Sequence, residues 1–137
     1  MDRAHTSSAQ WALVAYVSGD LEKNVALRAA GPEQIRSAAS TLAGSLCVSR
    51  ASVGRVLGLL REDLAEPASV QAWASLVRWG RFSEDLGARG QAIDLIYESG
   101  YEEKLIEVVG RLDEIGDLVD GAVSKAEIDY LRRLIGT

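Results

Sequence analysis

The sequence predicts an all-α single domain, a compact bundle of six to eight helices with at most one short strand pair. Three observations predict this fold class. The chain has 137 residues, a length that suits one hydrophobic core. Hydrophobic residues make up 47% of it, enough to build that core. Only two prolines occur, while alanine, leucine, glutamate and arginine, which favour helix, are abundant.

The chain from residue 1 to residue 31 is expected to hold two segments. Residues 9–17 are apolar enough to form either a helix or a buried strand, and both alternatives stay open. Ser18-Gly19 then ends this segment. Asp20 is expected to cap a short helix that stops at Gly31, since glycine is favoured just beyond a helix.

The next two helices are predicted by start signals and by apolar spacing. Pro32 begins a helix, and its inward face is expected to hold Ile35, Ala38, Leu42 and Leu46. Residues 47–48 are expected to make a turn, after which Ser49 caps a second helix. The predicted inward face of that helix is Val53, Val56, Leu57, Leu60 and Leu64.

A further helix is expected between Pro67 and Gly80. Trp73 belongs to its buried face, whereas Trp79 lies on a different face and is the better candidate for a contact surface. Residues 81–90 are rich in glycine and charge, and this composition predicts a loop.

The C-terminal part is expected to be helical. Residues 92–97 could be a strand or a short helix, and the spacing does not decide between them. Tyr101 begins an amphipathic helix with an inward face of Leu105, Val108, Val109, Leu112 and Ile115. The sequence Ser124-Lys125-Ala126-Glu127 has the pattern of a capping box and predicts the start of the last helix.

The residue inventory argues against an enzyme. His5 is the single histidine and Cys47 the single cysteine, so neither a nucleophile with its base nor a cluster of metal ligands can be assembled from them. We therefore expect no catalytic residues, no metal and no cofactor. A lone cysteine suits a reducing compartment, and the apolar run 11–17 is too short to span a membrane. A cytoplasmic protein without membrane contact is expected.

Charge is distributed unevenly along the chain. Residues 1–65 carry seven Lys/Arg against six Asp/Glu, whereas residues 66–137 carry eight against fourteen. No acidic residue lies between Gln34 and Arg61. Such an imbalance indicates a charged partner, which would be negative if it binds the acid-free stretch and positive if it binds the acidic C-terminal half.

Residues 39–58 resemble the helix-turn-helix of lac-repressor-type bacterial regulators. Ala43 stands where the two helices of that motif touch, and Cys47 is a small residue at the turn. Apolar residues at the packing positions also match, namely Val48, Val53 and Val56.

This resemblance implies double-stranded DNA as the partner and a homodimer as the assembly. Arg50, Ser52 and Arg55 would face the bases, because arginine and serine can bond to base edges. Arg36 and Arg61 would contact phosphates. An ordinary helical hairpin would use the same apolar spacing, so a purely structural role for residues 39–58 stays open.

The acidic C-terminal helices, residues 91–137, support a different hypothesis. Nine acids lie between Asp94 and Asp120, against Lys104 and Arg111 alone. In size, charge and helicity the chain resembles small bacterial immunity or antitoxin proteins, a resemblance that no motif carries. It implies a basic protein as the partner. The expected contact residues are Glu102, Glu103, Glu107, Trp79 and Tyr101.

Overall fold

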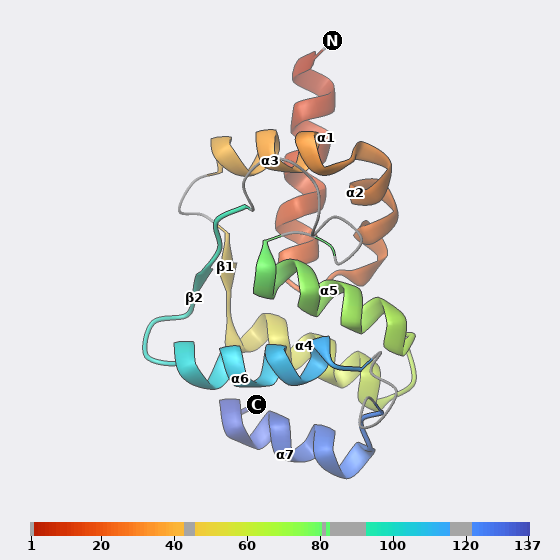
Figure 1. Cartoon of the computed structure of the whole chain (residues 1–137), viewed down its shortest axis with the longest axis vertical. Coiled ribbons are helices and arrows are strands. Elements are labelled where there is room, and N and C mark those ends of the chain that lie inside the picture. Colours follow the sequence, from red (N-terminus) through yellow and green to blue (C-terminus); the bar gives the residue numbers. More distant parts are fainter. Residues whose placement is uncertain (1, 43–45, 81, 83–92, 116–121) are drawn as a thin grey trace.

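A computed structural model describes residues 2–42, 46–80, 82, 93–115 and 122–137, with side chains from residue 9 onward. Over these residues the chain forms seven α-helices, one short 3-10 helix and a two-stranded sheet (Figure 1). The predicted compact, mostly helical fold is confirmed. The helices form two groups, one from the N-terminal part of the chain and one from the rest.

The first group contains the elements before residue 42: α1 (Asp2–Val17), the 3-10 helix η1 (Leu21–Lys23), α2 (Asn24–Ala30) and α3 (Pro32–Thr41). Residues 9–17 are therefore helical. The helices α2 and α3 both pack on α1, in the upper half of Figure 1. The prediction that Leu42 and Leu46 extend the helix begun at Pro32 is wrong, because α3 ends at Thr41.

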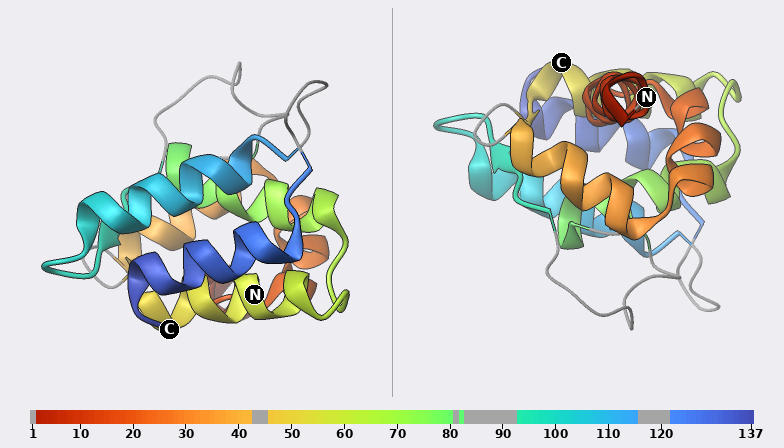
Figure 2. Two further views of the ribbon diagram at one scale, coloured as in Figure 1. Left: turned by 90° about the horizontal axis from the view of Figure 1, so that it is seen from below. Right: turned by 90° about the horizontal axis from the view of Figure 1, so that it is seen from above.

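The second group consists of α4 (Arg50–Arg61), α5 (Pro67–Trp79), α6 (Glu102–Asp113) and α7 (Lys125–Ile135). Helix α5 packs on α6, and α7 packs against both α4 and α6, as the view from below shows (Figure 2, left). Thus α4 has neighbours on several sides.

A short parallel sheet joins the start of α4 to the start of α6. The strands are β1 (Cys47–Val48) and β2 (Ile96–Tyr97), with Cys47 opposite Ile96 and Val48 opposite Tyr97. The amide of Ile96 donates to the Leu46 carbonyl at 2.9 Å, and the amide of Glu98 donates to the Val48 carbonyl at 3.0 Å. The expected turn at residues 47–48 is thus a strand, and the ambiguous 92–97 segment contributes its partner.

Most of the predicted helix boundaries follow their local signals. Ser49 caps α4, its hydroxyl accepting from the Ser52 amide, and Ser124 caps α7 in the same way from Glu127. Pro32 and Pro67 stand at the first helical positions. Asp20 is an exception, because its side chain makes no capping hydrogen bond to η1.

One continuous core connects the two groups of helices. Trp73 of α5 is fully buried, and its indole nitrogen donates to the Tyr16 carbonyl of α1 at 2.7 Å. The predicted inward residues of α4 are buried with the exception of Leu64, which is 74% exposed. Leu64 follows the end of α4 at Arg61, so the helical spacing no longer applies to it. The predicted loop at 81–90 falls outside the described residues apart from Phe82.

Across the described residues, no helix combines the length and the apolar character that crossing a membrane requires.

Candidate functional site

The residues expected to read DNA sit on a helix that is enclosed by its neighbours. Helix α4 packs on α5, α6 and α7. Ser52 is only 5% exposed, and its hydroxyl lies 2.9 Å from that of Ser49. A Cβ on Gly54 would come within 3.0 Å of the Thr137 hydroxyl oxygen. The expectation that Ser52 faces DNA is wrong, because this side of α4 is covered.

Arg50 is also engaged within the fold. Its Nε donates to Glu98 Oε2 at 2.8 Å, its backbone amide donates to Glu98 Oε1 at 2.9 Å, and its guanidinium stacks 3.9 Å from the centre of the Tyr101 ring. These contacts tie the first residue of α4 to the segment between β2 and α6.

The bonds from Arg50 lower the pKa of the Glu98 carboxyl. The hydrogen bond from the Arg50 backbone amide is the largest cause, and the side-chain bond and charge of Arg50 act in the same direction against partial burial. The carboxylate form of Glu98 is therefore the form that the fold stabilises.

The other predicted DNA contacts do not form one surface with Arg50. Arg61 Nε donates to Asp129 of α7 at 2.9 Å. Arg36 lies on α3, which packs on α1 and α2 in the other group of helices. Arg55 is exposed on α4. In its described part, the segment 39–58 comprises the end of one helix, a strand and a second helix, so DNA binding stays a prediction without geometric support.

Helix α6 presents an acidic face to solvent. Its buried side is formed by Leu105, Val108, Val109 and Leu112. At 100° per residue, the direction opposite to these residues is occupied by Glu103, Glu107, Gly110 and the capping residue Glu114. Glu102, Glu103, Glu107 and Glu114 are all exposed. Beside them, Ile106 is 50% exposed.

Lys104 is an exposed basic residue on α6 itself, whereas the arginines near this face are held by other partners. Arg111 forms two bonds to the Glu127 carboxylate of α7, at 2.6 and 3.0 Å, and a third to the Ala122 carbonyl. Arg78 pairs with Asp113 at 3.0 Å. No ion pair within the described residues engages Glu102, Glu103 or Glu107. Their charge is therefore open to a partner.

Trp79, at the C-terminal end of α5, borders the same face. Its indole nitrogen donates to Asp113 Oδ2 at 2.9 Å, and the Arg78 guanidinium lies 4.6 Å from the centre of its ring. Gln71 donates to Asp113 Oδ1 at 3.1 Å. Trp79 is 48% exposed. A half-exposed aromatic side chain is thus held in one orientation before any partner binds.

The structure revises the list of expected partner contacts. Tyr101 is half-buried beneath Arg50, so it is not an open aromatic anchor. Glu98 and Asp113 are used within the fold, and Asp117 and Asp120 lie outside the described residues. The sequence reading missed Ile106, although its position off the apolar stripe of α6 could have marked it. We name Glu102, Glu103, Ile106, Glu107, Glu114 and Trp79 the α6 surface.

The part of the chain that the structure describes contains no group of three His, Cys, Asp or Glu side chains that could hold a metal ion. No protein-family model, curated protein or solved structure matches the chain.

Proposed function

We propose that this protein is a non-enzymatic binding module whose α6 surface recognises a basic protein. The observation that carries the proposal is the set of exposed glutamates Glu102, Glu103 and Glu107, which have no ion pair within the described residues. Ile106 of the same helix is 50% exposed. More specifically, the small size and negative charge of the chain suggest an acidic inhibitor that binds a basic toxin.

Two physical effects support the α6 surface as an interface. Unpaired carboxylates attract a basic partner and raise its association rate. Ile106 and Trp79 supply apolar and aromatic area, and residues of this kind carry much of the binding energy of protein interfaces. Because Asp113 and Arg78 already orient Trp79, little conformational entropy is lost when it is covered.

The test compares two double variants of the full chain with equal net charge. Glu103→Lys with Glu107→Lys reverses two charges at the centre of the α6 surface. Glu33→Lys with Glu62→Lys makes the same change at exposed positions on α3 and at the end of α4. The immobilised wild type and both variants are incubated with lysate of the source cells, and the association rate of each purified retained protein is then measured against salt.

We expect one basic protein to bind the wild type and the Glu33/Glu62 variant and to associate much more slowly with the Glu103/Glu107 variant. The difference between the variants should shrink at high salt, because ions screen exposed charges. Equal association with both variants would contradict a role for the α6 surface, and an acidic retained partner would contradict the proposed charge complementarity.

A further inference from the structure

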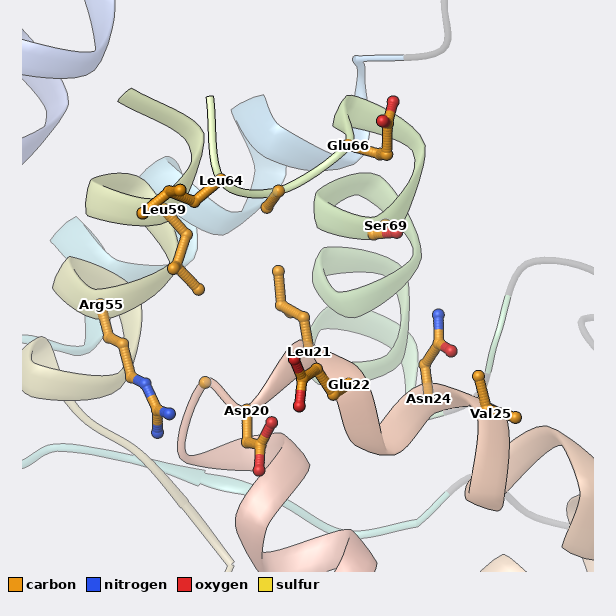
Figure 3. A pocket seen from close by; sticks show the side chains of 12 residues that line it. Asp20, Leu21, Glu22, Asn24, Val25, Arg55, Leu59, Leu64, Glu66 and Ser69 are labelled. Carbon is orange, nitrogen blue, oxygen red and sulfur yellow. The ribbon is translucent and has the colours of Figure 1, made fainter. Parts of the chain in front are cut away.

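A concave region lies away from α6, between η1 with the start of α2 and the corner that joins α4 to α5. It encloses a cavity volume of about 500 Å³. Its lining comes from both groups of helices, and Figure 3 shows side chains from η1, α4 and α5 around one space. No residue of α6 takes part in it, so this groove is separate from the α6 surface.

The groove has a mixed lining, in which apolar side chains stand beside charged and polar ones. Leu21 and Leu59 are among its lining residues and extend toward the enclosed space (Figure 3). Val25 is 73% exposed and Leu64 is 74% exposed. Large apolar side chains gathered in this way around a concavity are typical of binding sites rather than of an ordinary protein surface.

The corner between α4 and α5 keeps Leu64 outside the core. The preceding residue, Asp63, has a φ of 58°, which is uncommon for a residue other than glycine. The amide of Leu64 donates to the Leu59 carbonyl at 2.8 Å and closes this corner. The backbone thus holds a leucine at the edge of the groove, at some local conformational cost.

The charges around the groove are mainly negative. Asp20, Glu22 and Glu66 contribute carboxylates, and Arg55 contributes the one guanidinium of the described lining. No ion pair within the described residues joins Arg55 to any of these acids. An occupant therefore meets both apolar side chains and a net negative charge.

We infer that this groove binds a short peptide segment that carries both leucine-like side chains and lysine or arginine. The apolar side chains would lie against Leu21, Leu59 and Leu64, and the basic groups would lie beside Asp20 and Glu22. Arg55 packs over Gly19, next to Asp20, and at this place it can bind a carboxylate or carbonyl oxygen of the same segment. The inference stands on the residues of the groove and not on the α6 surface.

The test uses the full chain, labelled with ¹⁵N, and three synthetic hexapeptides. The first alternates leucine and lysine, the second has glutamate in place of lysine, and the third has serine in place of leucine. We expect the first peptide alone to shift the backbone amide signals of Leu21, Asn24 and Ser69, because it alone has both chemistries that the groove offers.

Variants at exposed positions then localise the effect without threatening the core. Glu22→Lys and Leu64→Ser should each weaken binding of the leucine-lysine peptide by about threefold, the scale of one exposed contact. Glu62→Lys is the matched control, because Glu62 is exposed and does not belong to the described lining of the groove. It should leave the affinity nearly unchanged.

Three results would overturn the inference. The serine-lysine peptide could bind as well as the leucine-lysine peptide, which would reduce the site to unspecific charge attraction. The signals could stay unshifted at saturating peptide. Finally, only the amide signals of α6 residues could shift. This result would exclude the groove as the binding site and leave the proposed function of the α6 surface intact.

Discussion

Glu98 holds the N-terminal end of α4 with both of its carboxylate oxygens. One accepts from the Arg50 backbone amide and the other from the Arg50 side chain. The N-terminus of a helix carries unsatisfied amides and a partial positive charge, so a carboxylate there is favourable. Ser49 satisfies another amide of the same turn. The N-terminus of α4 is therefore capped by two residues, Ser49 directly before the helix and Glu98 from the segment between β2 and α6.

This arrangement predicts a pH dependence of stability. The folded pKa of Glu98 lies below its ordinary value of 4.5. The ionised Glu98 carboxylate therefore contributes to the free energy of unfolding above pH 4.5, and this contribution is lost as the pH falls through the folded pKa. Glu98→Gln keeps the shape and removes the charge, so it should lower the free energy of unfolding at neutral pH. The difference from wild type should vanish in acid.

Urea denaturation of both proteins, from neutral pH to well below 4.5, measures this difference. Glu107→Gln serves as the control, because Glu107 is exposed in the middle of α6, away from the helix N-terminus, and has no ion pair within the described residues. A gap between wild type and Glu98→Gln that persists unchanged in acid would show that the charge of Glu98 is not what stabilises the start of α4.

On the scale of elements, α4 shows how one helix can carry two different glycines. Gly54 faces α7 and the C-terminal end, where a Cβ would lie 3.0 Å from the Thr137 hydroxyl oxygen. Gly58 is one turn further along, and a Cβ there would meet nothing within 4 Å. The first glycine permits close packing, whereas the second has no such role within the described residues.

The two glycines should respond differently to alanine. Gly58→Ala is expected to raise the free energy of unfolding by about 0.5–1 kcal/mol, because alanine is the better helix former and has room. Gly54→Ala gains the same propensity but crowds Thr137, so its stabilisation should be smaller or reversed. Chemical denaturation of the two variants side by side checks the ranking, and equal gains would contradict the packing of the C-terminal end on α4.

Across the whole molecule, the two groups of helices share one core. Trp73 is fully buried at their junction, and its bond to the Tyr16 carbonyl links α5 to α1. Tyr16 in turn packs against Phe82, with ring centres 5.8 Å apart. Because the buried residues form a single cluster, neither group is expected to unfold alone.

Trp73→Phe tests this coupling. The variant loses a buried hydrogen bond and part of the indole volume, so it should lower the free energy of unfolding by about 2 kcal/mol. Circular dichroism reports all helices, whereas the fluorescence change comes mainly from Trp79 of the second group, because Trp11 is already 74% exposed in the folded protein. The two transitions should still coincide. Separate midpoints for the two probes would show that the groups are independent folding units.

Local signals in the sequence were sufficient for much of the fold. Proline at the first helical position, serine at the cap and apolar residues at helical spacing act within one or two turns, so they can be read without knowing the neighbours. They correctly predicted the starts of α3, α4, α5 and α7. The negative charge of the C-terminal half is likewise a property of composition alone.

Tertiary structure decided which of these side chains are available. The sequence around Arg50 and Ser52 would be the same whether α4 protruded into solvent or lay under α7. Only the packed structure shows that Ser52 is buried and that Arg50 is bonded to Glu98. Pairing of β1 with β2 depends on residues almost fifty positions apart, which no local pattern encodes. Helical spacing gave Leu64 an inward place, but the chain leaves the helix before reaching it. Exposure, and with it the α6 surface and the groove, is set by contacts between distant segments, because burial belongs to the packed whole rather than to any single stretch of chain.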